Sequence, residues 1–131
     1  MATVMVDTSA IYALLDRSDA KHSEAVALLK KMRDSGDTVV VTNFVVAETH
    51  ALLLAKMGYS VARTWLEEQC WPVERAAAED EERAVEIVRS YADKTFSYTD
   101  AVTFAIMERL QMKVAFTFDK HFAQYGLIAY S

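Results

Sequence analysis

The sequence predicts an α/β fold of three layers, in which helices cover both faces of a central parallel sheet. Short runs of β-branched and aromatic residues, typical of buried strands, alternate along the chain with longer segments of helical periodicity. Strands and helices that alternate in this way form parallel sheets with helical crossovers. The chain of 131 residues has only one proline and three glycines, so we expect no flexible linker and a single domain over 1–131.

Five segments are expected to form the strands of the sheet. Three are short apolar runs, at residues 3–6, 38–42 and 113–118. A fourth, in "CWPVER", contains Pro72, and proline confines a strand to the edge of a sheet. The tail "GLIAY" is expected to form the last strand.

Two long helices are predicted from apolar residues that recur at i, i+3, i+4 and i+7. The first covers residues 21–35, and Gly36 supplies its stop. The second covers residues 76–92, where an apolar stripe lies behind the acidic run "AEDEER". The stripe consists of Ala84, Val85, Ile87, Val88 and Tyr91.

Capping residues predict the start of further helices. Asn43 is expected to cap a helix that ends at Gly58, and Ser60 is expected to cap a short helix over residues 60–69. A last short helix is expected at residues 120–125.

Composition narrows the class of protein. With 53% hydrophobic residues, the chain has enough apolar material for a core, and no apolar run approaches the roughly 18 residues that cross a bilayer. Because no leader-peptide pattern stands at the start, a cytoplasmic protein without a membrane partner is expected. The single cysteine, Cys70, is expected to be a small buried side chain.

The net charge of −5 at pH 7 disfavours a protein that coats nucleic acid through a basic surface. Four acids gathered in one metal site would, however, leave a balance of only about −1 elsewhere. The acidic total is therefore compatible with a metal site on a surface that does not repel nucleic acid.

Two acids directly follow expected strands. Asp7 comes after residues 3–6, and Asp119 ends the run "VAFTFD". A helix cap at Asp7 and a turn or short cap at Asp119 are the ordinary explanations. In parallel sheets, however, ligands bind beyond the carboxyl ends of the strands, which is where both side chains are expected.

Glu48 lies in "NFVVAETHALLLAKMG", and its neighbours on the same helix face are all apolar. An ionised carboxylate on a buried stripe is costly unless it is paired or bound to a metal. A structural salt bridge and a functional site both stay open at this point.

Asp100 has the spacing of a capping box with Ser97, and an aspartate in the first turn complements the helix dipole. Phe104 and Met107 follow at i+4 and i+7, so Asp100 begins a stripe that faces the core. Its carboxylate is expected to point inward, towards the sheet.

Four carboxylates that converge cannot share a dry pocket as anions, so they require a divalent cation. Oxygen ligands favour Mg²⁺ or Mn²⁺ over zinc. The four candidates are Asp7, Glu48, Asp100 and Asp119.

Other polar residues are weaker candidates. Thr8, Ser9 and Thr117 flank two of the acids and are placed to hydrogen-bond carboxylates or a phosphate. The three histidines lack the spacing of zinc ligands with cysteine, and surface or packing roles are expected for them. They are His22, His50 and His121.

At these residues the chain resembles a PIN domain, and specifically the VapC-type toxins of bacterial and archaeal toxin–antitoxin systems. The matching pieces are "VDTSAIYALLD", "VVAETHALLLAKMG", "SYTDAVTFAIMERL" and "AFTFDKHFAQYGL", in the order of the family and over nearly the whole chain. The resemblance places the acidic quartet of the family on Asp7, Glu48, Asp100 and Asp119. It places the supporting polar residues on Thr8 or Ser9 and on Thr117.

The resemblance implies an endoribonuclease that depends on Mg²⁺ or Mn²⁺, with a sheet of order 3-2-1-4-5. It also implies a homodimer and an antitoxin that wraps the toxin and blocks its site. On this interpretation Asp7 and Asp100 hold the principal ion, and Asp119 completes the site or binds a second one. Glu48 shares that role and orients or deprotonates the attacking water.

Three alternatives stay open. A PIN nuclease with a housekeeping role in RNA processing would carry the same site. A phosphoryl-transfer enzyme of haloacid-dehalogenase type also begins with an aspartate at a strand end, but it needs a second acid where this chain has Ser9. A binding module would use the acids only as helix caps, so Mn²⁺ would not change its thermal stability.

Overall fold

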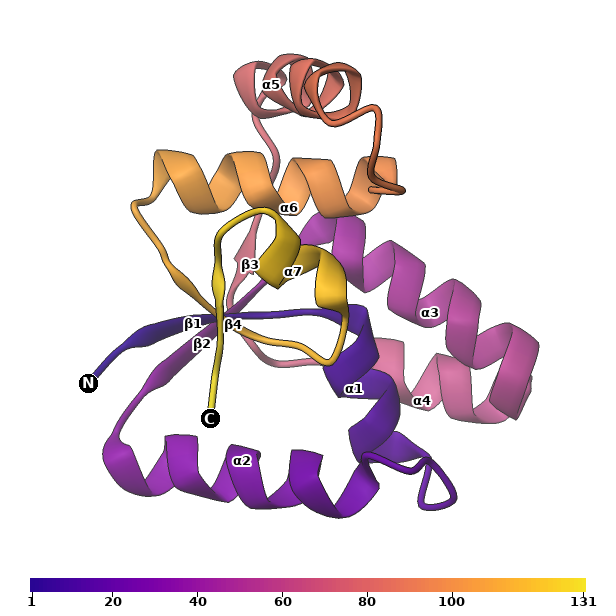
Figure 1. Ribbon diagram of the computed structural model, residues 1–131. Coiled ribbons are helices and arrows are strands. Elements are labelled where there is room, and N and C mark those ends of the chain that lie inside the picture. Colours follow the sequence, from indigo (N-terminus) through magenta and orange to yellow (C-terminus); the bar gives the residue numbers. More distant parts are fainter.

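The computed structural model describes residues 1–131 and contains a five-stranded, all-parallel sheet between layers of helices (Figure 1). The strand order is β3-β2-β1-β4-β5, so the predicted fold class and strand order are confirmed. The strands are β1 (Thr3–Val6), β2 (Thr38–Thr42), β3 (Val73–Glu74), β4 (Val114–Phe116) and β5 (Ile128–Ala129). The helices are α1 (Thr8–Leu15), α2 (His22–Ser35), α3 (Asn43–Met57), α4 (Tyr59–Glu68), α5 (Ala78–Ser90), α6 (Tyr98–Arg109) and α7 (Lys120–Gln124).

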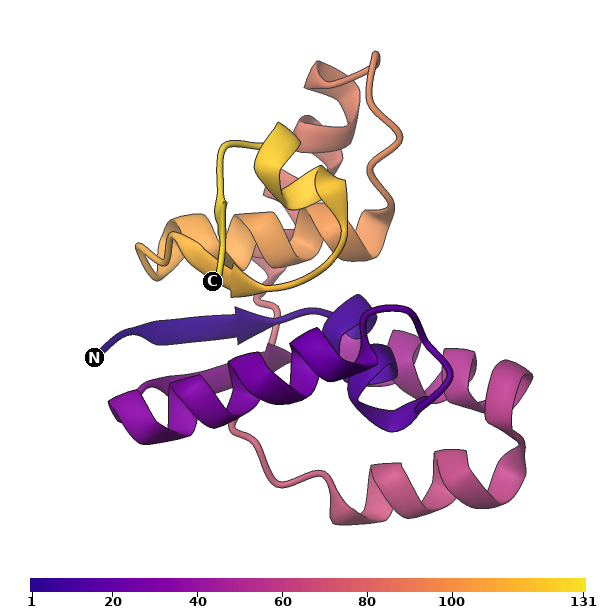
Figure 2. The same ribbon diagram turned by 60° about the horizontal axis from the view of Figure 1, so that its bottom comes forward.

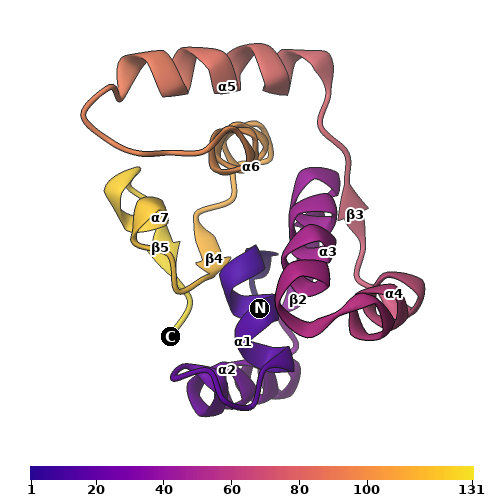
Figure 3. The same ribbon diagram turned by 90° about the vertical axis from the view of Figure 1, so that its right-hand side faces the viewer.

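The helices cover opposite faces of the sheet (Figure 2). α1 and α2 lie on one face and α6 lies on the other, with α5 packed outside α6 (Figure 3). The central strand β1 serves both layers, because successive side chains of a strand point to opposite faces. Val4 and Val6 pack on the side of α1 and α2, Met5 packs on the side of α6, and all three are fully buried.

The pairing of β1 brings distant parts of the chain to one edge of the sheet. Met5 lies opposite Val40 of β2 and opposite Ala115 of β4. One further bond continues the β1–β4 ladder, since the backbone N–H of Asp7 donates to the carbonyl of Phe116 at 3.0 Å. Because the strands run parallel, the turns that follow β1 and β4 are neighbours at the carboxyl edge.

The predicted cap of α3 is wrong by one residue. Thr42 is the N-cap, and its hydroxyl accepts a hydrogen bond from the backbone N–H of Val45 at 3.0 Å. The side-chain oxygen of Asn43 instead accepts from the backbone N–H of Ala76 at 2.9 Å, which ties the start of α3 to the segment after β3. Threonine and asparagine both suit an N-cap, but the side chain of Asn43 is engaged by Ala76, and Thr42 is the cap.

The junction between α3 and α4 also differs from the prediction. Gly58 ends α3 and precedes α4 directly, with φ of 92°, a conformation that favours glycine. α4 therefore begins at Tyr59, and Ser60 lies inside the helix rather than at its cap. The predicted stop of α2 at Gly36 is confirmed, with φ of 71°.

Two predictions about burial are wrong. α5 buries Ala84 and Ile87, but Val85 and Val88 are 48% and 41% exposed, because α5 packs mainly against α6 through one narrow stripe. Cys70 is exposed rather than buried. None of the helices combines the length and the apolar composition that a membrane span requires.

Candidate active site

Three aspartates come together at the carboxyl edge of the sheet, each at the start of a helix. Asp7 is the N-cap of α1 directly after β1, and Asp119 is the N-cap of α7 after β4. Asp100 is the third residue of α6. The backbone at a helix start carries a partial positive charge, so it favours a carboxylate there.

Two hydroxyl groups hold the buried carboxylate of Asp7. Its Oδ2 accepts hydrogen bonds from Ser9 Oγ at 2.7 Å and from Thr117 Oγ1 at 3.0 Å. The same hydroxyl of Ser9 accepts from the backbone N–H of Phe118, and that of Thr117 accepts from the backbone N–H of Asp119. The hydroxyls therefore join the turn after β1 to the turn after β4 and fix the two aspartates relative to each other.

The charge of Asp7 is unfavourable in this place. Burial, together with a smaller effect of the negative charge of Asp100, raises the pKa of Asp7 from its ordinary 3.8 to about 6, against the hydrogen bonds from Ser9 and Thr117. A cation bound beside these two carboxylates would relieve both effects.

Asp100 is 6% exposed and forms the predicted capping box with Ser97. Its backbone N–H donates to Ser97 Oγ at 3.0 Å, and its Oδ2 accepts from the backbone N–H of Ser97 at 3.1 Å. The same Oδ2 lies 2.9 Å from Nδ1 of His121. Asp100 thus caps its helix and faces the turn after β4 at the same time.

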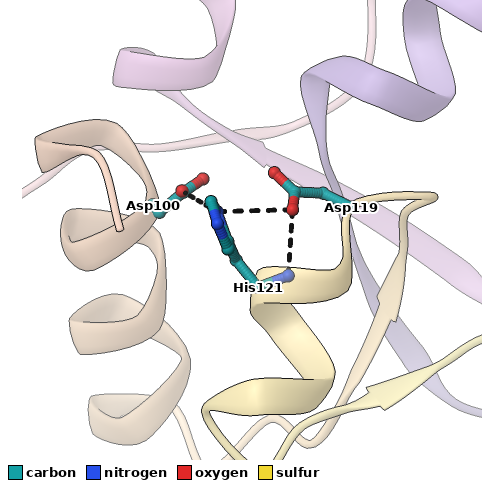
Figure 4. Close-up of side chains that lie close together, drawn as sticks. All are labelled: Asp100, Asp119 and His121. Atoms are coloured by element: carbon teal, nitrogen blue, oxygen red, sulfur yellow. Dashed lines mark hydrogen bonds and ion pairs between the residues drawn. The ribbon is translucent and has the colours of Figure 1, made fainter. Parts of the chain in front are cut away.

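His121 lies between two of the aspartates (Figure 4). Its Nδ1 is 2.9 Å from Oδ2 of Asp100 and 3.3 Å from Oδ1 of Asp119. Potential ligand atoms of these three residues lie within 4.8 Å of one another. The surface or packing role expected for His121 is therefore incomplete, since the ring packs on Phe96 but also belongs to the acidic group.

The sequence signal for His121 is its place two residues after Asp119, at the second position of a short helix that Asp119 caps. A side chain at that position lies at the same edge of the sheet as the residue that caps the helix. The other two histidines lie elsewhere: His22 contacts the carbonyl oxygen of Ala13, and His50 borders a separate surface hollow beside Arg75.

Glu48 is half-buried, and the expectation that it lies on a buried stripe is wrong. The buried face of α3 consists of Val45, Thr49 and Leu53, whereas Ala51 next to Glu48 is exposed. Glu48 forms none of the ion pairs of the structure, so the alternative of a structural salt bridge does not apply.

Glu48 lines an open hollow of about 500 Å³ between α3 and the start of α6. Thr99, the residue before Asp100, lines the same hollow. Glu48 and Asp7 lie outside the close group formed by Asp100 with Asp119 and His121. Glu48 therefore lies on the side of α3 that faces the start of α6, outside the close group of Asp100, Asp119 and His121.

The small polar residues divide into two roles. Ser9 and Thr117 contact the carboxylate of Asp7, as described above. Thr8 instead accepts a buried hydrogen bond from the hydroxyl of Thr49 at 3.2 Å, which joins α1 to α3. Of the two predicted neighbours of Asp7, Ser9 is the one at the carboxylate.

The donor set fits a divalent cation. No lysine or arginine forms an ion pair with any of the four acids. Each aspartate has one oxygen held by hydrogen bonds, whereas Oδ1 of Asp7, Oδ1 of Asp100 and Oδ2 of Asp119 have no donor. Uncompensated carboxylates with free oxygens are the ligands that Mg²⁺ and Mn²⁺ prefer.

A larger cleft lies away from the acids. It measures about 520 Å³ and is mainly apolar, with Leu15, Trp65 and Trp71 among its lining residues. None of the four acids borders it. Its chemistry suits an apolar partner rather than a phosphate.

The fold and the acidic edge agree with the comparison to known families. The family model of the PIN domain matches residues 4–127, so the chain belongs to the PIN-domain family. Two curated relatives come from Mycobacterium tuberculosis. The ribonuclease VapC26 is 28% identical over 124 residues, which cover 92% of this chain and 90% of VapC26. The 23S rRNA-specific endonuclease VapC20 is 33% identical over 129 residues, which cover 95% of each chain.

The solved structures agree. The crystal structure of VapC20 from Mycobacterium tuberculosis, described as a toxin that cleaves the sarcin-ricin loop, matches with a TM-score of 0.84 and 29% identity. The match covers 95% of this chain and 96% of that one. VapBC2 from Rickettsia felis shares the fold, with a TM-score of 0.69 and 13% identity over 98% of this chain and 97% of that one. The prediction of a PIN-domain ribonuclease of the VapC toxin type is confirmed.

Proposed function

We propose that this ribonuclease hydrolyses phosphodiester bonds of RNA at the edge formed by Asp7, Asp100 and Asp119, with Mg²⁺ or Mn²⁺ as its cofactor. The observation that carries the proposal is the set of carboxylates that have no lysine or arginine partner and that each keep a free oxygen. Such a set is costly without a cation.

In the proposed site the aspartates bind the ion and Glu48 acts on the water. Asp100 and Asp119 hold the ion together with Asp7, whose Oδ2 is fixed by Ser9 and Thr117 while its Oδ1 stays free. When bound, a divalent ion supplies Lewis acidity that acidifies a water and offsets charge on the phosphate. Glu48, which lines the neighbouring hollow and has no ion-pair partner, would be the group that orients an attacking water and accepts its proton.

Ribosomal RNA is the proposed substrate class. The support is VapC20, which is named for its action on 23S rRNA and is 33% identical over nearly the full length of this chain. The surroundings of the aspartates suit an RNA backbone despite the acidic total charge. Lys120 follows Asp119 directly, and the ammonium group of Lys21 lies over the ring of Phe118, 5.9 Å from its centre.

A protein antitoxin and a homodimer complete the proposal. The resemblance to toxins of toxin–antitoxin systems supports both. The apolar cleft that contains Trp65 and Trp71 offers the antitoxin a surface of suitable chemistry, because an amphipathic helix buries its apolar face in such a groove.

The test of the nuclease site uses Asp7→Asn and Asp100→Asn. Each purified variant is expected to fold and to lose at least about 100-fold of its divalent-ion-dependent cleavage, since even residues outside the first ring of ligands cost 10–100-fold. The measurement is the rate of RNA cleavage with added Mg²⁺ or Mn²⁺, with the new RNA ends mapped.

Asp34→Asn is the matched control, because Asp34 is exposed and pairs only with Arg33. It is expected to cleave at the wild-type rate. Wild-type cleavage by a folded Asp100→Asn protein would overturn the assignment. Induced expression separates a toxin from a housekeeping nuclease, since the toxin stops growth and the product of a small neighbouring gene restores it.

A further inference from the structure

His121 occupies a position that the carboxylate chemistry alone does not explain. Its ring is 15% exposed and is held on three sides. Nδ1 faces Asp100 and Asp119, Nε2 lies 3.0 Å from Thr95 Oγ1, and the ring packs edge-to-face on Phe96 with centres 5.4 Å apart. The imidazole is therefore fixed with one nitrogen aimed at the acidic group (Figure 4).

The spacing around Nδ1 matches the spacing of ligands around a metal ion. An octahedral ion with bonds of about 2.1 Å has neighbouring ligand atoms about 3.0 Å apart. Nδ1 lies 2.9 Å from Oδ2 of Asp100 and 3.3 Å from Oδ1 of Asp119, the oxygens that also accept from backbone N–H groups, while the other oxygen of each carboxylate stays free. When Nδ1 of His121 carries a proton, this one N–H can donate a full hydrogen bond to only one of the two carboxylates.

Thr95 provides the support that a ligating histidine needs. Histidines that bind metals donate the other ring N–H to an acceptor, which fixes the tautomer and aims the lone pair at the ion. The hydroxyl of Thr95 can accept from Nε2–H, and it can donate when Nε2 carries the lone pair. A change of tautomer therefore gives the neutral ring an Nδ1 lone pair on the side of Asp100 and Asp119.

We propose that Nδ1 of His121 is a nitrogen ligand of the metal site, so that the site has mixed nitrogen and oxygen donors and prefers Mn²⁺ to Mg²⁺. The inference rests on the proposed function, in which Asp100 and Asp119 hold the ion. Mg²⁺ selects oxygen ligands, whereas imidazole is a ligand of transition metals. The nitrogen therefore adds affinity for Mn²⁺ and little for Mg²⁺.

The test measures metal binding and not cleavage. The full chain is stripped of metal with a chelator and titrated with Mn²⁺ and with Mg²⁺ by calorimetry. The wild type is expected to bind Mn²⁺ at least about tenfold more tightly than Mg²⁺. Electron spin-echo spectroscopy of the Mn²⁺ protein is expected to show the modulation of a directly coordinated ¹⁴N.

Three variants separate a ligand from a hydrogen-bond donor. His121→Asn, which puts an amide oxygen near the place of Nδ1, is expected to lose the ¹⁴N signal and to bring the Mn²⁺ and Mg²⁺ affinities closer together. Thr95→Val removes the support of the ring and is expected to weaken Mn²⁺ binding about tenfold while keeping the ¹⁴N signal. His50→Asn, outside the group of Asp100, Asp119 and His121, is the control and is expected to match the wild type in metal binding.

The possible failures are distinct. One failure concerns His121 alone: Mn²⁺ binds through Asp100, but the wild type shows no ¹⁴N signal and His121→Asn keeps the ratio of Mn²⁺ to Mg²⁺ affinity. This result overturns the role of His121 and leaves the proposed nuclease site intact. A wild-type protein that binds neither ion, or that binds as well after Asp100→Asn, overturns both.

Discussion

Asp7 serves two purposes at once. Its backbone position and its bond to the N–H of Ser9 make it the N-cap of α1, and the hydroxyls of Ser9 and Thr117 fix its carboxylate at the edge of the sheet. A cap on an exposed helix needs no burial, yet Asp7 is 4% exposed and lies near the charge of Asp100. The free-energy cost of the negative charge on Asp7 therefore comes from its surroundings in the site and not from its role as a helix cap.

Asp7→Asn tests that cost in the metal-free protein. The pKa of Asp7 is about 6 in the folded protein and 3.8 ordinarily, so folding favours the protonated acid. The stability of the wild type therefore falls as the pH rises from about 4 to about 6, by at most roughly 3 kcal/mol. Asparagine caps a helix as well as aspartate, so the variant is expected to be about 1–3 kcal/mol more stable at pH 7.5.

The measurement is urea unfolding in the presence of a chelator at pH 7.5 and at pH 4. The gain in Asp7→Asn is expected to shrink to well under about 1 kcal/mol at pH 4, where the carboxyl is protonated in the folded state and near its midpoint in the unfolded chain. An equal difference in the free energy of unfolding at both pH values would contradict the explanation. Asp34→Asn again serves as the exposed control.

At the scale of elements, helix starts assemble the site and helix packing holds it. Asp7 and Asp119 are the N-caps of α1 and α7, and Asp100 lies in the first turn of α6. α6 is in turn braced by α5 through one pair in which Asp80 is buried and Arg109 is partly exposed. Arg109 of α6 donates two hydrogen bonds to Asp80 of α5, at 2.9 and 2.8 Å, and Asp80 also accepts from the backbone N–H of Ala77 at the start of α5.

Asp80→Asn is expected to lower the free energy of unfolding by about 1–3 kcal/mol, because a charged pair and a helix start are lost together. The hydrogen bond from Arg109 keeps the pKa of Asp80 below 3.8, so this stabilisation is present above pH 4 and is lost as the pH falls through the folded pKa. Urea unfolding at pH 7 and pH 3 measures the difference.

The control for Asp80→Asn is Glu86→Gln, since Glu86 is exposed and pairs with Arg83 on the same helix. It is expected to change the stability by less than about 0.5 kcal/mol. Cleavage per folded molecule is expected to be unaffected by Asp80→Asn, because the pair lies away from the carboxylates. A stable Asp80→Asn protein at pH 7 would show that α5 is held by apolar packing alone.

For the molecule as a whole, the acidic edge couples metal binding to folding. An ion that binds the folded state alone adds about 2.7 kcal/mol at 100 times its dissociation constant, which corresponds to a rise in Tm on the order of 10 °C for a chain of this size. Mn²⁺ is expected to produce this rise in the wild type and a smaller one in Asp100→Asn. An equal rise in both proteins, followed by differential scanning fluorimetry, would place the ion elsewhere.

The strand positions and the places of Asp7 and Asp119 could be predicted because they depend on local sequence and on one rule of parallel sheets. The apolar neighbours of Glu48 predict a buried stripe, but only the start of α6 covers that face of α3, so Glu48 is half-buried and Ala51 is exposed. The sequence pattern predicts only a surface or packing role for His121. It does not show the tertiary contacts of His121 with Asp100 and Thr95. Hydrophobic periodicity describes one helix or strand at a time, whereas the surroundings of Glu48 and His121 depend on which other elements pack against them.

The central place of β1 also governs when the enzyme can become active during its synthesis. The first strand made is completed by a partner strand near the end of the chain, and the bond between Thr117 and Asp7 spans 110 positions. A nascent chain on the ribosome therefore carries Asp7 long before Asp119 exists. If Asp7 and Asp119 act together as proposed, cleavage is expected only after β4 and the turn that follows it have left the ribosome and docked on β1.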